Sequence, residues 1–152
     1  MIDKSIVSCG GVVICRGKAL VLYHKNGRNS GWVLPKGKAE GEETFRDTAI
    51  REVAEESGAV ARVVKSLGKT QYSFQRSNGS IKKTVHWFLM ITNSYHCKPQ
   101  AEEYFADGGF YKQHEAYHLL RYQDEKDILN RAFIEYTKRP GNTKRKERDN
   151  IV

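Results

Sequence analysis

The sequence has few of the features that mark a membrane or secreted protein. No apolar run approaches the roughly 20 residues that a membrane-spanning helix needs. Residues 1–5 lack the basic-then-apolar order of a signal peptide. The three cysteines, Cys9, Cys15 and Cys97, are odd in number and lie in no metal-ligand spacing. We therefore expect a cytoplasmic protein that needs no membrane, whose cysteines are reduced and mostly pack in the interior.

The chain also lacks internal repeats, and its 152 residues are the size of one ordinary domain. Hydrophobic residues make up 39%, which argues against disorder of the whole chain. We expect one domain over residues 1–137, followed over residues 138–152 by a basic tail without stable structure. Nothing in the sequence distinguishes a monomer from a homodimer.

The positive charge is unevenly distributed. The formal net charge is +8, and half of it lies in the tail, where six basic residues stand against two acidic ones. The rest of the chain carries only +4. This balance is compatible with a small polyanionic substrate, and it is weak evidence for a nucleic-acid partner.

Local patterns predict an alternation of strands and helices. Short β-branched or aromatic stretches predict strands at residues 6–14, 19–23, 60–66, 70–75, 83–92 and 110–111, with a hairpin turn at 77–79. Helical periodicity predicts helices at residues 43–57, 113–120 and 124–137, the first ended by Gly58. Residues 24–30 and the segment around Gly37 read as loops. This order predicts a mixed sheet covered by helices on both faces.

Three carboxylates share one face of the first helix. Glu52, Glu55 and Glu56 stand at i, i+3 and i+4, where like charges repel by a few tenths of a kcal/mol per pair when exposed. Their position near the helix end adds to the cost, because the helix dipole disfavours anions there. A hard cation such as Mg²⁺ would offset that repulsion. A solvated acidic face explains the three residues equally well, so the surrounding sequence has to decide.

A glycine-containing loop with two lysines precedes this helix. Backbone N–H groups near Gly37, together with Lys36 and Lys38, would suit phosphate oxygens. Loop and helix combined follow a fixed spacing. Its elements are Gly37, five residues, Glu43, seven residues, and then Arg51-Glu52-Val53-x-Glu55-Glu56-x-Gly58. This 23-residue pattern resembles the signature of the Nudix hydrolases, and it departs from it only at Ala59, where a larger aliphatic residue is usual.

The resemblance implies an α/β/α sandwich and a Mg²⁺-dependent hydrolase of phosphoanhydride bonds, with Mn²⁺ as a substitute. Carried over by position, Glu52, Glu55 and Glu56 would bind the metal, and Gly37 would allow the close turn beside them. Arg51 would pair with Glu43 to hold loop and helix together. The general base would be Glu52 or an acid of a later loop, Glu102 or Glu103. Ordinary exposed surface acids are an equally good interpretation of these two loop residues.

Flanking segments are similar to asymmetrical diadenosine tetraphosphate hydrolases over most of residues 6–136, although Phe110 stands where that group often has Trp. This similarity implies that Lys36 and Lys83 lie near the phosphate chain and that Tyr72 and Tyr122 stack on a base. Ordinary packing remains an alternative for both tyrosines, and Lys83 could protect a sheet edge. His114 and His118 lack the glutamate of a zinc motif, and we interpret them as surface residues.

Other functions stay open at this point. An RNA 5′-end, a nucleotide sugar or an inositol pyrophosphate would suit the same box, and the basic tail would then track phosphates. A non-catalytic ligand-sensing domain is a further alternative. The presence of every glutamate of the box speaks against it.

Overall fold

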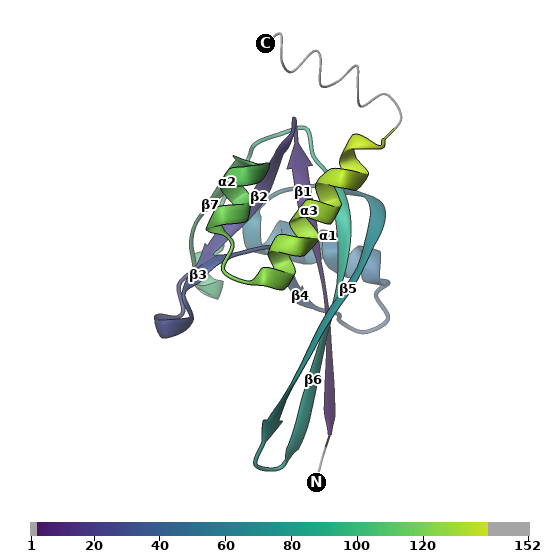
Figure 1. The fold of residues 1–152 in the computed structure, drawn as a ribbon, viewed down its shortest axis with the longest axis vertical. Helices are drawn as coiled ribbons and strands as arrows, with labels where there is room; N and C mark the ends of the chain where they lie inside the picture. The colour runs from purple at the N-terminus through teal and green to yellow at the C-terminus, as the bar shows by residue number, and fades with distance from the viewer. Residues whose placement is uncertain (1–2, 140–152) are drawn as a thin grey trace.

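The computed structural model describes residues 3–139, and its strands join into one seven-stranded sheet of order β3-β2-β1-β6-β5, with β4 paired to β1 and β7 to β2 (Figure 1). The strands are β1 (Lys4–Cys15), β2 (Lys18–His24), β3 (Gly31–Val33), β4 (Lys36–Lys38), β5 (Arg62–Arg76), β6 (Gly79–Ile91) and β7 (Phe105–Lys112). β1 and β6 run parallel along eleven paired positions, while the other neighbours are antiparallel. The sheet is therefore mixed, as the sequence predicts.

Helices cover both faces of the sheet (Figure 1). They are α1 (Phe45–Ser57), α2 (Gln113–Leu119) and α3 (Gln123–Thr137). Ala49 and Val53 of α1 are fully buried against one face, beside Val13 and Met90. α2 and α3 cover the other face. The predicted α/β/α sandwich is confirmed.

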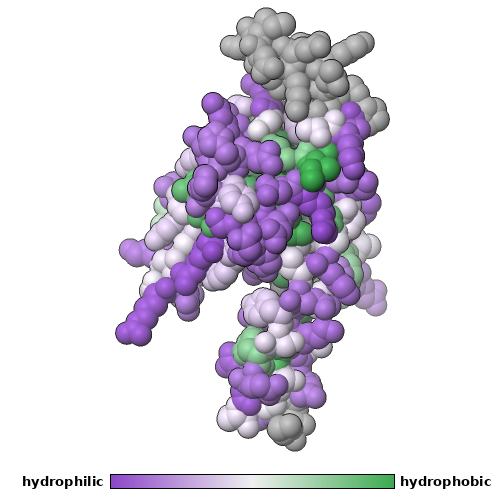
Figure 2. Space-filling model, viewed as in Figure 1, coloured by the Kyte–Doolittle hydropathy of each residue, from purple (hydrophilic) through white to green (hydrophobic). Residues whose placement is uncertain are grey.

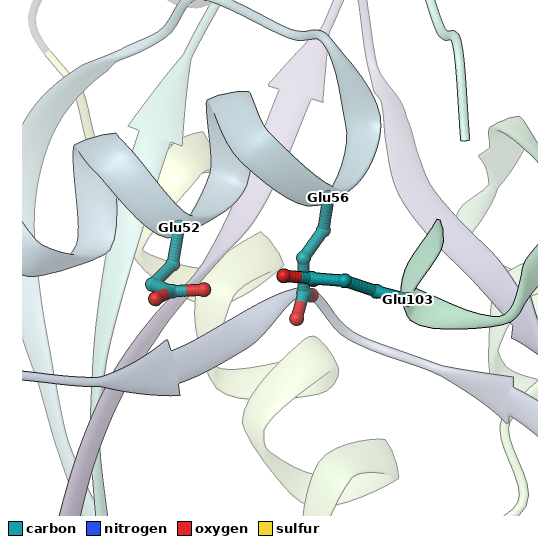
Figure 3. Close-up of side chains that lie close together, drawn as sticks. All are labelled: Glu52, Glu56 and Glu103. Atoms are coloured by element: carbon teal, nitrogen blue, oxygen red, sulfur yellow. The ribbon is translucent and has the colours of Figure 1, made fainter. Parts of the chain in front are cut away.

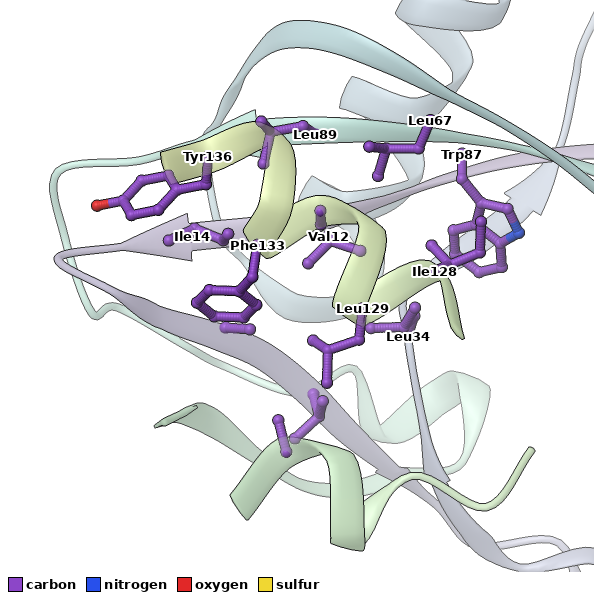
Figure 4. Packing of buried hydrophobic residues seen from close by; sticks show 14 of the residues in the cluster. Val12, Ile14, Leu34, Leu67, Trp87, Leu89, Ile128, Leu129, Phe133 and Tyr136 are labelled. Atoms are coloured by element: carbon purple, nitrogen blue, oxygen red, sulfur yellow. The ribbon is translucent and has the colours of Figure 1, made fainter. Parts of the chain in front are cut away.

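The core under α3 is the larger of the two apolar clusters. Leu129 and Phe133 of α3 pack against Val12 of β1 and Leu89 of β6, with Leu34 beside them (Figure 4). Burying one such side chain contributes roughly 1.5–3 kcal/mol. This packing places the start of α3 next to the segment around Leu34, from which the glycine loop continues.

β1 changes partners along its length, and this opens space for the glycine loop. Its residues Ser8, Cys9 and Gly10 pair with β4, whereas Ile14 and Cys15 pair with β2. A Cβ on Gly10 would lie 2.3 Å from the Pro35 carbonyl oxygen. Only glycine therefore lets the chain before β4 approach β1 this closely.

Several boundaries differ from the sequence prediction. The separate strands expected at 60–66 and 70–75 form the single strand β5, whose bulges lie at the Val63/Lys65 and Ser66/Gly68 positions. The bulges take up residues that break the alternation, so the strand continues through them. The last strand covers Phe105–Lys112, whereas the sequence predicted only residues 110–111. α1 begins at Phe45 rather than at Glu43, because Thr44 is its N-cap. The segment of Lys36 to Lys38, expected as a loop, is strand β4.

Other features agree with expectation. Gly58 ends α1 with a left-handed φ of 76°. The three cysteines are reduced, with Cys9 and Cys15 buried and Cys97 half-buried. Within residues 3–139 no helix is both long and apolar enough to span a bilayer. Thr137 ends α3, and residues 140–152 of the predicted tail lie outside the described part of the chain.

Candidate active site

Helix α1 presents two buried carboxylates toward β4. The side-chain oxygen of Thr44 accepts a hydrogen bond from the Asp47 N–H and caps the first turn. From that start, Glu52 and Glu56 are one helical turn apart, and they are only 8% and 7% exposed. Charged side chains are rarely buried to this extent without a partner, so the face marks a site.

Arg51 ties the glycine loop to the helix. Its guanidinium donates two hydrogen bonds to the Glu43 carboxylate, at 2.7 and 2.9 Å, and one to the Lys38 carbonyl oxygen at 2.9 Å. The Arg51 guanidinium and the Glu40 N–H hold the pKa of Glu43 down at about 2. A fork-to-fork pair of this kind orients both partners. The predicted pairing of Arg51 with Glu43 is thus observed.

A third carboxylate joins the two on α1. Glu103, from the short 3-10 helix Ala101–Glu103 that precedes β7, points toward Glu52 and Glu56 (Figure 3). One oxygen from each of the three residues lies within 4.8 Å of the others. The cluster therefore combines one segment of the box with a loop about fifty residues further along the chain.

Glu52 and Glu56 resist ionisation in this arrangement. The pKa of Glu56 is raised to about 8, mainly by burial and also by the charge of Glu52, while the hydrogen bond from the Lys36 N–H opposes the rise. Burial also raises the pKa of Glu52, against the lowering effect of Arg51. Adjacent buried carboxylates without a cation are costly when charged. A bound cation would remove that cost.

The donor set fits a hard divalent metal ion. Carboxylate oxygens are the ligands that Mg²⁺ and Mn²⁺ prefer. Gly37 is part of the same arrangement, because a Cβ at this position would lie 2.0 Å from Oε2 of Glu52. The backbone of β4 can approach the Glu52 carboxylate only where a side chain is absent. Glu52 and Glu56 are positioned to hold the ion, and Glu103 faces them from the later segment.

A pocket of about 770 Å³ opens beside the carboxylates. Glu56, Glu103 and Lys36 are among the residues that line it, and we call this part of the lining its carboxylate end. The predicted residues on its wall also include Lys83 of β6, Tyr72 of β5 and Tyr122 at the start of α3. Tyr72 is 51% exposed and Tyr122 is 42% exposed, so both offer ring surface to a ligand.

Three predicted residues lie elsewhere. Glu55 is exposed, its carboxylate accepts a hydrogen bond from Arg51 at 3.2 Å, and it is not part of the three-carboxylate cluster. Its role as a metal ligand stays a prediction. Lys38 is exposed and does not line the pocket. Glu102, the neighbour of Glu103, is also exposed and outside the cluster, and His114 and His118 lie on the surface as expected.

One buried acid on the pocket wall was not predicted from the sequence. Glu125, 4% exposed in the first turn of α3, accepts a hydrogen bond from the Leu34 N–H at 2.7 Å. Burial raises its pKa to about 7. An acid in a first helical turn ordinarily serves the helix dipole, so its type and position carry no signal of burial.

Comparisons with known proteins agree with this architecture. MutT4 of Mycobacterium tuberculosis (strain CDC 1551 / Oshkosh) is 49% identical over 88 residues, which are 58% of this chain and 31% of that protein. Nudix hydrolase 21, chloroplastic, of Arabidopsis thaliana is 33% identical over 84 residues, 55% of this chain and 40% of that one. The matched segments thus span less than half the length of either relative.

Solved structures share the fold at low identity. The NUDIX domain of NrtR from Shewanella oneidensis, complexed with ADP ribose, has a TM-score of 0.70 at 14% identity, over 86% of this chain and 88% of that one. The Ap4A hydrolase of C. elegans has a TM-score of 0.66 at 18% identity, over 86% and 98%. The model of the NUDIX domain matches residues 7–133. The carboxylate helix, the glycine loop and this match together show that the chain belongs to the Nudix family.

Proposed function

We propose that the protein hydrolyses a phosphoanhydride bond in a nucleoside diphosphate-linked substrate, using Mg²⁺ or Mn²⁺. The observation that carries this proposal is the meeting of Glu52, Glu56 and Glu103 at the end of a pocket that also holds Lys36. Cations and carboxylates at one end of a cavity suit a phosphate chain bound through a metal.

Each residue has a role in the proposed reaction. A bound Mg²⁺ supplies charge neutralisation of the phosphates and a water of lowered pKa. Glu52 and Glu56 hold the ion in place. Glu103 accepts a proton from the attacking water, because its loop position leaves it more exposed than the two helix residues. Lys36 orients the phosphate oxygens.

The favoured substrate is a dinucleoside polyphosphate such as diadenosine tetraphosphate. Tyr72 and Tyr122 come from different elements of the pocket wall and offer two ring surfaces, and Lys83 supplies a second cation for a long phosphate chain. The cavity volume lies within the 300–1,000 Å³ range of ligand pockets. The C. elegans structure named above is that of an Ap4A hydrolase, and it shares this fold.

A substrate panel tests the proposal. The full chain is incubated with Mg²⁺ and diadenosine tetraphosphate, ADP-ribose or 5′-triphosphorylated RNA, and the products are separated by chromatography. We expect ATP and AMP from diadenosine tetraphosphate. If another compound of the panel is hydrolysed preferentially, that compound replaces diadenosine tetraphosphate as the proposed substrate. Tight binding without turnover of any compound would instead indicate a ligand-sensing domain.

A pair of neighbouring acids tests the assignment of the base. Glu103→Gln should lower kcat by roughly 100-fold or more, the typical contribution of general base catalysis. Glu102→Gln, one residue away and outside the cluster, should stay within about twofold of the unmodified protein. Equal effects of the two substitutions would remove Glu103 from the mechanism.

A further inference from the structure

Strands β5 and β6 continue past the helices and form a projection with the start of β1 (Figures 1 and 2). We call this projection, made of residues 4–6, 72–76 and 79–83, the arm. In it Tyr72 stands opposite Lys83, Phe74 opposite Ile81 and Arg76 opposite Gly79. α1, α2 and α3 leave the arm uncovered (Figure 1).

One face of the arm combines aromatic rings with cations. Tyr72, Phe74 and Arg76 alternate along β5 and so point to the same side, together with Lys83 across from Tyr72. The rings of Tyr72 and Phe74 are stacked with centroids 6.3 Å apart. Nζ of Lys83 lies 5.9 and 5.7 Å from these two centroids, and Cζ of Arg76 lies 5.2 Å from that of Phe74. The rings and the charges therefore form one interleaved surface.

Negative charge is absent from this face among the described residues of the arm. Lys4, which pairs with Ile81, adds a third cation to it. Asp3 immediately precedes β1 and points to the opposite face, where its carboxylate accepts hydrogen bonds from the backbone and side chain of Ser80. The face is thus complementary to a polyanion.

The face is continuous with the pocket. Tyr72 and Lys83 line the pocket, whereas Phe74 and Arg76 lie beyond it. At about 3.3 Å per residue, the strand from Tyr72 to Arg76 extends roughly 13 Å, the length of several stacked nucleotides at about 3.4 Å each. A ligand that fills this surface is consequently longer than the pocket.

We propose that this face of the arm binds single-stranded nucleic acid, with bases against Tyr72 and Phe74 and phosphates at Lys83 and Arg76. Tyr72 is exposed and Phe74 is half-buried. Accessible aromatic rings between cations are the combination that holds unpaired bases without regard to sequence. A duplex hides the faces of its bases and would gain only the phosphate contacts. This binding goes beyond the proposed hydrolysis and needs no metal.

Fluorescence anisotropy with a 3′-labelled decauridine tests the proposal on the full chain, in EDTA at about 50 mM salt. Phe74→Ala should weaken binding roughly 5- to 150-fold, the range for loss of one base stack. Arg76→Ala should weaken it severalfold and reduce its salt dependence. The matched control is Lys82→Ala, because Lys82 pairs with Ser73 and points to the other face of the same arm. We expect Lys82→Ala to change affinity by less than about twofold.

Either of two results would overturn the proposal. The first is that decauridine binds no more tightly than uridine monophosphate, and the second is that Lys82→Ala and Phe74→Ala have equal effects on affinity. A dimer seen by sedimentation in the unmodified protein and lost in Phe74→Ala would assign the face to a second copy of the chain. Hydrolysis of diadenosine tetraphosphate is measured in parallel. If the protein binds decauridine through Phe74 but does not hydrolyse the dinucleotide, only the proposed function is contradicted. If it hydrolyses the dinucleotide but does not bind decauridine, only the proposed nucleic-acid binding is contradicted.

Discussion

The two ends of the pocket are assembled in opposite ways. At the carboxylate end, Glu52 and Glu56 lie one turn apart on α1, and Lys36 lies in β4, the strand that precedes that helix. At the aromatic end, Tyr72 and Tyr122 come from β5 and the start of α3, elements that meet only in the folded chain. The carboxylate end is thus local in sequence except for Glu103, which a distant segment contributes, whereas the aromatic end is built entirely from distant segments.

This difference assigns the chemical step to the carboxylate end and substrate recognition to the aromatic end. The carboxylate end is held by short-range constraints, namely helical spacing and the Arg51–Glu43 pair. The aromatic end depends on sheet pairing and on the core under α3. Substitutions at the first end should abolish turnover, and substitutions at the second should change affinity.

The largest expected effect is at the carboxylate end. Glu56→Gln should lower kcat by at least about 100-fold, equivalent to about 2.7 kcal/mol, because a metal ligand is lost. Steady-state hydrolysis with Mg²⁺ measures it. Without the metal, the same variant should be at least as stable as the unmodified protein, since a buried carboxyl group is replaced by a neutral amide. Activity near that of the unmodified protein would remove Glu56 from the metal site.

A pH-dependent effect is expected at Glu125 on the pocket wall. Burial raises its pKa from 4.5 to about 7 in the folded protein. The folded state therefore binds more protons than the unfolded state between these values, and stability falls as pH rises from about 4.5 to about 7. The Glu125 carboxylate then costs roughly 3 kcal/mol above pH 7.

Glu125→Gln should remove that cost while keeping an acceptor for the Leu34 N–H. Urea denaturation should show the variant to be more stable than the unmodified protein by roughly 3 kcal/mol at pH 8, and equally stable near pH 4.5. A difference in the free energy of unfolding that does not change with pH would show that the Glu125 carboxyl titrates normally.

A smaller effect is expected from adding one methyl group to the glycine loop. Gly37→Ala would place a Cβ 2.0 Å from Oε2 of Glu52 and force that carboxylate to move. We expect roughly a tenfold or larger loss of kcat, since misplacing a catalytic group by about 1 Å can cost up to 100-fold. Gly109→Ala is the matched control, because its Cβ would meet nothing closer than 3.5 Å. Equal activities of the two variants would mean that the close approach has no catalytic value.

The smallest effect is expected at the aromatic end. Tyr72→Ala should raise KM for diadenosine tetraphosphate about tenfold with little change in kcat, because base stacking contributes about 1–3 kcal/mol. Tyr72→Phe keeps the ring and should retain most of the affinity. A fall in kcat with unchanged KM would place Tyr72 in the chemistry rather than in recognition.

The part of the fold that could be predicted rests on strong local patterns. The strands of residues 6–14 and 83–92 and the helix around Val53 are long enough for their periodicity to be distinctive. β4 was missed because its three residues, Lys36–Lys38, include a glycine and two charges. It is a strand because β1 offers an unpaired edge at Ser8 to Gly10, which no property of the segment itself reveals.

The sequence by itself determined the carboxylate helix and the glycine loop at a fixed distance from it. These features follow from helical periodicity and residue spacing, which act within one segment. The pairing of Arg51 with Glu43 was implied by the resemblance to the Nudix signature, and the structure shows it. Only the tertiary structure decided that Glu103 joins the carboxylates and that Glu125 is buried on the pocket wall. It also decided that β5 and β6 extend as an arm. The reason is physical, because contacts between distant segments depend on how the whole sheet pairs and packs.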